Sequence, residues 1–410
     1  MTDETPTTLG DTTDRCPYGY YAAARDRGDA TYEEQASAWI VPTYAGVKRV
    51  FTDEDTFARP TPIDIVQSEK YVPIMGGPRH NSALVGQERL DHRKWWLGLF
   101  NRSAIEAYRS GLITDVIDTQ INRIASAGRA ELVEDYTGRV SIRVIAGVLG
   151  LPWDDDDWMS QLRKRLDMME HYKSIVFLKP AEALEMADAT LAATAEVNEL
   201  IRPFMERARD AADDTIMSRI WHDESLEAWN ESDKYGIART FFSAGSDTTR
   251  TQMSNALYIL LTQPSVAEQV RDAEPAVVAN FIEEALRLHG TVHFRARNVT
   301  SDTEIGGHKI RAGENVVGVM ASANRDELQY PQADSVNLNR PNPRSHIAFS
   351  TGIGACAGAS LARAELQEGV SRLVNRLRDL RLDDDAEAPF PEGLLFRLYR
   401  PLNVTFTPES

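Results

Sequence analysis

Helical periodicity over residues 91–287 is the feature that most constrains the fold of this chain. Apolar residues recur there at the spacing of one helix face, which predicts a largely helical body. Turns that contain proline divide the stretch at three places: Leu151-Pro152, Lys179-Pro180 and Gln263-Pro264. We also expect a short helix over residues 18–27 and another helix after residue 356.

Strand patterns are fewer and shorter. One covers residues 38–41, several lie within residues 292–317, and a further alternation covers residues 394–406. No internal repeat and no Gly/Ser linker divides the chain. The pattern therefore predicts a mainly α (α+β) protein with a minor β region. We expect a single domain over residues 1–410, in which residues 1–15 form a disordered N-terminal segment.

Charge and cysteine usage exclude several classes of protein. The net charge of the 410 residues is −17, which argues against a nucleic-acid binder because such a protein needs a basic face. The only two cysteines, Cys16 and Cys356, make a disulfide framework implausible and fit a reducing compartment. No stretch approaches the roughly 18 apolar residues of a membrane helix. We therefore expect a cytoplasmic protein with no membrane or nucleic-acid partner.

Cys356 lies in a glycine-rich turn that leads directly into an alanine-rich helix, within the segment AFSTGIGACAGASLARAEL over residues 348–366. Unpaired N–H groups and the positive end of the helix dipole favour the thiolate at such a junction. Such a sulfur is a metal ligand or a nucleophile. The alternative is a small buried hydrophobic residue, which is usual for a lone cysteine. The turn alone leaves both possibilities open.

Two other stretches break or use local rules of helix structure. Residues 241–261 form an apolar helix pattern that is interrupted by Gly245, Asp247 and Thr248, and such an interruption often marks a functional site. The alternative is a polar face turned to solvent. Glu284 and Arg287 are three residues apart and share a helix face, so they either pair in a functional network or form an ordinary surface ion pair.

In this order and spacing, the three stretches resemble the cytochrome P450 family, and the resemblance covers nearly the whole chain. AGSDTT at residues 244–249 resembles the oxygen-activating helix motif of that family, and EALR carries its Glu-x-x-Arg motif at Glu284 and Arg287. FSTGIGACAG resembles its haem-binding loop, with the matching residues Phe349, Gly352, Cys356 and Gly358. The resemblance implies a soluble bacterial enzyme of the cytochrome P450 fold that holds haem b.

The resemblance also implies roles for individual residues. Cys356 would be the thiolate ligand of the haem iron, and Phe349 would pack beside it. Ala244 and Gly245 would let the helix open beside the iron. Thr248 would hydrogen-bond the oxygen that is being activated, and Asp247 would relay protons towards it.

Glu284 and Arg287 would form a buried network that supports the haem loop.

The chain departs from the family pattern where the haem propionates are bound. A basic residue is expected two positions before the cysteine, where this chain has Gly354. His92 matches a family histidine, but Trp96 replaces the arginine four residues later. Arg297 matches the family's propionate-binding arginine. Arg295 is unusual: it either replaces the missing propionate partner, which we favour, or binds an acidic group on the substrate.

The substrate pocket implied by the resemblance is mostly apolar with a few polar groups, as in most small-molecule sites. For each of its residues, ordinary core packing is an equally good interpretation. The pocket residues are Ile74, Met75, Met168, Met169, Tyr172, Thr240, Ser243, His293, Leu395 and Phe396.

The function expected from the resemblance is a haem-thiolate monooxygenase that inserts one oxygen atom from O2 into a small organic substrate by hydroxylation, O-dealkylation or epoxidation. The chain ends soon after the haem loop, so we expect electrons from a separate ferredoxin and ferredoxin reductase, and we expect a monomer. Four residues would form a basic patch for that acidic partner: Arg93, Lys94, Arg344 and Arg363. The alternatives are a peroxide-driven peroxygenase, a non-catalytic haem-binding or scaffold domain, and a haem-free cysteine-nucleophile enzyme.

Overall fold

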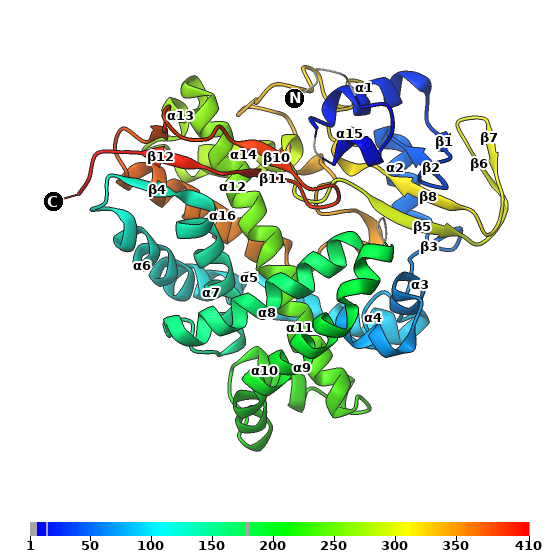
Figure 1. Ribbon diagram of the computed structural model, residues 1–410, viewed down its shortest axis with the longest axis horizontal. Helices are drawn as coiled ribbons and strands as arrows, with labels where there is room; N and C mark the ends of the chain where they lie inside the picture. Colours follow the sequence, from blue (N-terminus) through cyan, green and yellow to red (C-terminus); the bar gives the residue numbers. More distant parts are fainter. Residues whose placement is uncertain (1–5, 14, 177–179, 410) are drawn as a thin grey trace.

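The computed structural model describes residues 6–13, 15–176 and 180–409. Most of it is a body of helices, with a small sheet region on one side (Figure 1). The helices of this body are α4 (Gly86–Leu99), α5 (Arg102–Tyr108), α6 (Thr114–Ile124), α7 (Gly138–Leu149), α8 (Asp156–Ile175), α9 (Pro180–Asp210), α10 (Ile216–His222), α11 (Glu231–Gly245), α12 (Asp247–Thr262), α13 (Pro264–Val270), α14 (Pro275–Leu288) and α16 (Ala359–Arg376).

A five-stranded sheet forms the other side, in the order β1-β2-β8-β5-β3. Only the β2–β8 pair is parallel, and the other neighbours are antiparallel. The strands are β1 (Thr31–Glu33), β2 (Ala38–Val41), β3 (Phe57–Ala58), β5 (Arg295–Val299) and β8 (Asn315–Gly318). Four short helices lie around this sheet: α1 (Tyr18–Arg27), α2 (Tyr44–Thr52), α3 (Pro62–Val66) and α15 (Met320–Ala323).

The remaining strands form small separate sheets. They are β4 (Arg129–Glu131), β6 (Thr303–Ile305), β7 (His308–Ile310), β9 (Arg381–Leu382), β10 (Phe390–Glu392), β11 (Leu398–Arg400) and β12 (Asn403–Thr405). β12 pairs with both β4 and β9, which joins the C-terminal tail to the helical body.

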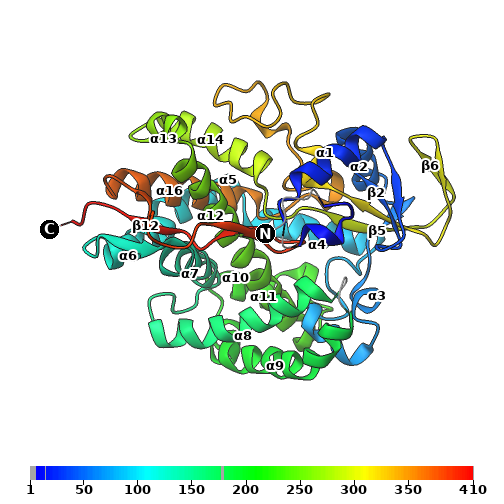
Figure 2. The ribbon, with the colours of Figure 1, turned by 45° about the horizontal axis from the view of Figure 1, so that its top comes forward.

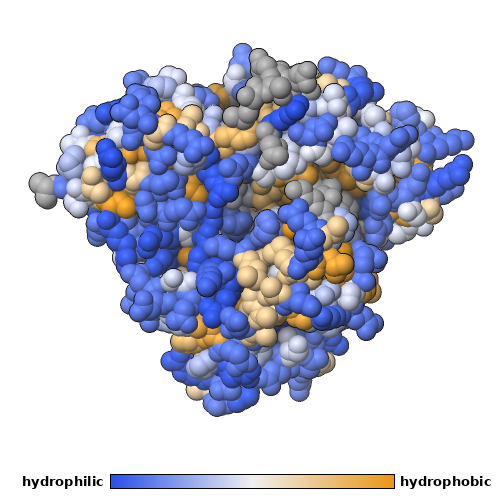
Figure 3. Space-filling model, in the orientation of Figure 1, coloured by the Kyte–Doolittle hydropathy of each residue, from blue (hydrophilic) through white to orange (hydrophobic). Residues whose placement is uncertain are grey.

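Helix α12 lies at the centre of the main core, where it packs on α7, α14 and α16. Residues 249–257 of this helix are all buried, because neighbouring elements cover it on every side. Helices α8 and α9 pack side by side and cover α11 from outside (Figure 2). Hydrophilic residues cover most of the face in Figure 3, and apolar residues gather near its middle.

The helical body and the minor β region confirm the expected mainly α architecture. The helix over residues 18–27 and the strand over residues 38–41 have the expected bounds. β4 was not expected, and it forms because β12 supplies its hydrogen-bonding partner. In the described part of the chain, no helix is long and apolar enough to cross a membrane.

The N-terminal expectation does not hold for residues 6–13. Leu9 is only 2% exposed, and its N–H donates to Glu33 in β1 over 3.0 Å. Residues 1–5 and 14 lie outside the described residues, and so does Lys179 of one expected turn.

Candidate functional site

A cavity of about 590 Å³ lies between the α11–α12 junction, β5, α4 and the loop that carries Cys356. It brings together most of the residues that the sequence pattern singled out. Those that line it are Ile74, Met75, His92, Trp96, Thr240, Ser243, Ala244, Gly245, Thr248, Arg295, Arg297, Phe349, Cys356, Gly358, Leu395 and Phe396.

The prediction that Met168, Met169 and Tyr172 of α8 line the pocket is wrong. Met169 and Tyr172 are buried at 0% and 2% exposure in the core, and Met168 does not line the cavity. The cavity instead meets the more polar side of α8, through Glu170, Lys173 and Ser174. The apolar stripe of an amphipathic helix faces the protein core, so the apolar residues here pack inward and leave the polar ones at the pocket.

The pocket position that the resemblance implied for His293 is also wrong. The side chain is 1% exposed, and its Nδ1 lies 2.8 Å from the hydroxyl of Tyr21, outside the cavity lining. Regular strand alternation begins only with β5 at Arg295, so His293 does not have to share the face from which Arg295 and Arg297 reach the cavity.

The loop of Cys356 is held by the backbone. The N–H of Cys356 donates to the carbonyl of Phe349 over 2.8 Å, and α16 begins three residues later. Gly352 has a φ of +67°, a left-handed conformation that favours glycine. It does not line the cavity but lies against α2, where an added Cβ would lie 3.3 Å from the carbonyl oxygen of Phe51.

The thiol of Cys356 opens into the cavity although it lies deep within the fold. Burial raises its pKa, while a hydrogen bond from the Gly358 backbone and the charges of Arg93, Arg363 and Arg295 act in the opposite direction. The expectation of a favoured thiolate is therefore wrong for the protein alone. A metal would favour the thiolate, because metal binding releases the proton of a thiol ligand.

The long helix expected over residues 241–261 is broken at Ser246, between α11 and α12. Gly245 fits this break, because a Cβ there would lie 2.9 Å from Ile145. The Thr248 hydroxyl donates to the carbonyl of Ala244 across the break over 2.6 Å. The Thr248 hydroxyl thus lies at the cavity, at the point where the helix is interrupted.

Asp247 does not line the cavity and lies next to Arg250, with an Oδ1–Nη1 distance of 3.6 Å. Burial raises the pKa of its carboxyl to about 6, and the nearby Glu170 carboxylate adds to the rise. A carboxyl with this pKa exchanges protons readily near neutral pH.

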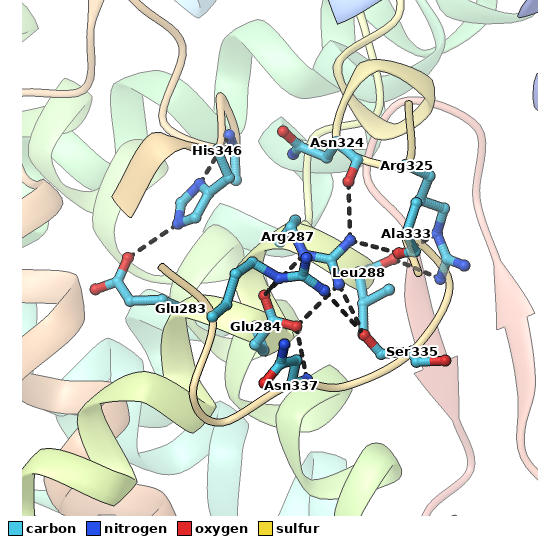
Figure 4. Close-up of polar contacts among 12 residues, drawn as sticks. Glu283, Glu284, Arg287, Leu288, Asn324, Arg325, Ala333, Ser335, Asn337 and His346 are labelled. Atoms are coloured by element: carbon cyan, nitrogen blue, oxygen red, sulfur yellow. Dashed lines mark hydrogen bonds and ion pairs between the residues drawn. The ribbon is translucent and has the colours of Figure 1, made fainter. Parts of the chain in front are cut away.

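Glu284 and Arg287 form a fully buried ion pair, with two hydrogen bonds of 2.8 and 2.9 Å (Figure 4). Arg340 adds a third bond to Glu284 over 2.8 Å, and the N–H of Asn337 adds a fourth over 2.9 Å. Arg287 in turn donates to the carbonyl oxygens of Asn324, Ala333 and Ser335, which lie in the segment leading to the cysteine loop.

The neighbouring Glu283 serves the cysteine loop directly. It pairs with Arg363 through bonds of 2.7 and 2.9 Å and with His346 over 2.9 Å. Burial alone would raise the pKa of Glu283, but these bonds hold it at about 2. Arg344 also lies 3.5 Å from this carboxylate, so Glu283 partly neutralises the basic patch expected from Arg344 and Arg363.

Arg295 and Arg297 both reach the cavity from β5. Arg297 is buried, its Nε has no hydrogen-bond partner among the described residues, and burial lowers its pKa to about 10. Arg295 forms no ion pair within that same part of the chain and lies 6.0 Å from the ring centroid of Phe396. Both cations have capacity for an anion that the protein itself does not supply.

His92 is not a cation in this structure. Burial lowers its pKa to about 4, and its Nε2 accepts a hydrogen bond of 2.7 Å from Trp96. The ring stacks on Trp229 at 4.7 Å, and its Nδ1 lacks a partner in the described residues. His92 can thus offer one neutral N–H to a ligand, whereas Trp96 uses its only donor on His92.

Four cationic residues on the cavity wall were missed by sequence reasoning: Arg59, Arg89, Lys173 and Arg239. Glu54 forms two hydrogen bonds with Arg89 and lies 4.0 Å from Arg59. A Cβ at Gly354 would lie 3.2 Å from Glu54, so a carboxylate lies where the family carries a base. No local signal marks Arg59 or Arg89, whereas Arg239 stands out as a charge in an apolar helix.

The residues present fit a haem. A thiol, an apolar wall and unpaired cations face one cavity, and haem has an iron, an apolar ring and two carboxylates. Arg295, Arg297 and the free Nδ1 of His92 supply donors of the kind that carboxylates bind. No cluster of metal-binding residues competes with Cys356 in the described residues.

Comparison with known proteins gives the same answer. The family model described as cytochrome P450 matches residues 158–404. The mycinamicin IV hydroxylase/epoxidase of Micromonospora griseorubida is 28% identical over 88% of this chain and 87% of its own length. Cytochrome P450 GfsF of Streptomyces halstedii is 32% identical over 75% and 72%.

Solved structures share the fold. CalO2 superposes with a TM-score of 0.86 at 25% identity and covers all of both chains. P450BioI, in complex with an acyl carrier protein, gives a TM-score of 0.84 at 22% identity over 95% of this chain and 98% of its own. This chain, with a thiol, an interrupted helix and a buried Glu-x-x-Arg pair around one cavity, belongs to the cytochrome P450 family and is a cytochrome P450 monooxygenase.

Proposed function

We propose that the enzyme holds haem b and inserts one oxygen atom from O2 into a small organic substrate, with electrons from a separate ferredoxin and ferredoxin reductase. One observation carries this proposal: the Cys356 sulfur and the Thr248 hydroxyl line the same cavity, and the helix opens between Gly245 and Asp247. Hydroxylation and epoxidation are the favoured outcomes, because the mycinamicin relative is named for both reactions.

Bound haem supplies the oxygen chemistry, and Cys356 is the residue that would hold its iron. The Gly358 N–H beside the sulfur would moderate its charge, as second-shell donors do. Arg295 and Arg297 would bind the propionates. Trp96 and Phe241, stacked at a centroid distance of 4.2 Å, close the wall near α4 and exclude water.

Proton delivery is assigned to Asp247 and Thr248. The Thr248 hydrogen is directed to the Ala244 carbonyl, so the lone pairs of its oxygen can accept a proton donor in the cavity. Asp247 lies outside the cavity, paired with Arg250, and its side chain is 30% exposed. With a pKa of about 6 it can take a proton from solvent and pass it inward, while Arg250 and Glu134 hold it in place and stay charged.

The redox partner would approach the outer side of the cysteine loop. Lys94 is exposed and Arg344 is 69% exposed, and both can attract an acidic surface. Arg93 lines the cavity instead, and Arg363 is engaged by Glu283, so these two contribute less than expected. We propose that the enzyme works as a monomer in the cytoplasm.

The test is turnover of the purified enzyme with NADPH, O2, a ferredoxin and its reductase. A peroxygenase does not need the acid–threonine pair, whereas this chain has it in Asp247 and Thr248. Product should therefore form with this system and not with hydrogen peroxide alone. Thr248→Ala should bind substrate as the wild type does but divert most electrons to peroxide, since a hydroxyl partner for the activated oxygen is lost. Unchanged coupling of NADPH to product in this variant, or peroxide-driven product at the same rate, would contradict the proposal.

A further inference from the structure

Arg239 is a buried cation that has no carboxylate partner among the described residues. It lies on the wall of the pocket that α11 forms away from the cysteine loop, here called the distal wall. It belongs to α11, lines the same cavity as Cys356, and is 3% exposed. In the part of the chain that the structure describes, its guanidinium donates to two neutral oxygens only, Oδ1 of Asn198 in α9 and the carbonyl of Pro73 at 3.3 Å. The Nε has no partner among the described residues.

No carboxylate forms an ion pair with Arg239 anywhere in residues 6–13, 15–176 and 180–409. Burial lowers its pKa to about 10, and no nearby acid opposes this shift. A buried charge without a partner costs several kcal/mol, whereas an incoming anion would remove much of that cost. Five N–H donors in a planar fork also suit a carboxylate, which accepts two of them side by side.

The other cations of the cavity already have partners or belong to the haem edge. Lys173 is bonded to Glu170 over 2.9 Å and to Ser243 over 2.8 Å, and Arg89 is bonded to Glu54. Arg93 and Arg295 lie close enough to Cys356 to act on its pKa, and Arg239 does not. Arg239 is therefore separate from the cations that would meet the propionates.

The surroundings of Arg239 are built closely around it. The 3₁₀ segment η2 (Glu69–Met75) packs on α9, and the chain just after it touches α11, where a Cβ on Gly236 would lie 2.2 Å from the carbonyl oxygen of Gly76. Nine residues separate Arg239 from Thr248, roughly 13 Å of helix at about 1.5 Å per residue. An anion at Arg239 would thus lie well away from the reacting carbon.

We propose that Arg239 binds a carboxylate of the substrate, so that the enzyme oxidises an apolar organic acid at a carbon several bonds from its acid group. This assignment rests on the proposed function and names its substrate class. The apolar remainder would extend past Thr240 and Ala244 towards Thr248, and Leu395 and Phe396 would cover it from the C-terminal tail.

The test compares acids with their methyl esters, which differ only in the charge. The panel contains straight-chain acids from hexanoic to hexadecanoic and 4-alkylbenzoic acids, each paired with its ester. Binding to the wild-type holoenzyme is followed by the shift of the haem absorption band and, independently, by calorimetry. At least one acid should bind about tenfold more tightly than its ester, a difference of about 1.4 kcal/mol.

Variants then assign that preference to Arg239. Arg239→Gln should bring the acid and the ester within about twofold of each other, and Arg239→Lys should keep part of the preference because it keeps the charge. Arg202→Gln is the matched control, since Arg202 lies on α9, is 41% exposed and pairs with Glu199. This control should keep the full preference for the acid.

The proposal fails if every acid of the panel binds the wild type no better than its ester, or if the preference survives in Arg239→Gln. Should the glutamine variant not fold, Arg239→Lys decides. Weaker acid binding with unchanged ester binding supports the assignment, and equal binding of the acid to the lysine variant and the wild type overturns it.

The carbon monoxide spectrum separates failure of the Arg239 assignment from failure of the proposed function. A missing thiolate-type band with an Arg239-dependent acid preference in calorimetry would refute only the monooxygenase assignment.

Discussion

Two buried arginines, Arg287 behind the cysteine loop and Arg239 on the distal wall, show how differently the two sides of the cavity are built. Arg287 is 1% exposed and has a carboxylate and three carbonyl oxygens as partners. Arg239 is 3% exposed, and its only hydrogen-bond partners among the described residues are two neutral oxygens. Complete bonding fixes a structure, whereas an unmet buried donor leaves capacity for a ligand. The cysteine side is thus a rigid support, and the distal wall is adapted to binding.

The largest effect should come from the thiol on the rigid side. Cys356→Ser should abolish the absorption band of the reduced carbon monoxide complex that is typical of thiolate-bound haem, because serine cannot supply a thiolate. Cys16→Ser is the control, since Cys16 is exposed and lies in the N-terminal segment. Loss of the band in the Cys16 variant alone would show that the ligand is misassigned.

The next largest effect should come from the network behind the loop. Glu284→Gln would leave Arg287 and Arg340 buried with no carboxylate between them, so we expect the free energy of unfolding to fall by about 3–5 kcal/mol. Denaturant titration of the holoenzyme measures this. Glu199→Gln, which breaks an exposed pair with Arg202, should leave stability unchanged within error. Equal effects of the two variants would remove the contrast between the two sides.

On the distal side, Asp247 should make stability depend on pH. Its pKa is about 6 in the folded protein against 3.8 ordinarily, so the unfolded chain ionises first and stability falls as pH rises from about 4 to 6. Partial exposure limits the loss to on the order of 2 kcal/mol at pH 7. Asp247→Asn should remove this dependence and slow turnover. Parallel pH curves for variant and wild type would mean that Asp247 is not the titrating group.

The smallest effect should be at the edge of the cavity. Arg295→Ala should speed haem transfer to apomyoglobin by about tenfold, because one charge-assisted partner of a propionate is lost. Gly354→His should restore at most part of the retention, since the new ring would also meet Glu54. Full haem retention with weaker acid binding in Arg295→Ala would instead assign Arg295 to the substrate.

Local patterns predicted much of the site because its chemistry depends on backbone features that sequence encodes. The cysteine turn needs glycine at Gly352, and the helix break needs a residue without a side chain at Gly245, so both leave a legible trace. The Glu284–Arg287 pair follows from helix spacing in the same way. Residues brought in by distant elements leave no such trace, and Glu54 beside Gly354 is an example.

The sequence by itself determined the helical body, the haem loop, the interrupted helix and hence the family. Only the tertiary structure decided which face of α8 meets the cavity, where His293 points, that His92 is neutral, and that Arg239 has no carboxylate partner among the described residues. Helix and turn signals arise from neighbours along the chain, whereas burial, pKa and unmet hydrogen bonds depend on every element packed around a group. The family of the enzyme can therefore be predicted from local sequence motifs, whereas the proposed preference for an acidic substrate depends on how distant elements pack around Arg239.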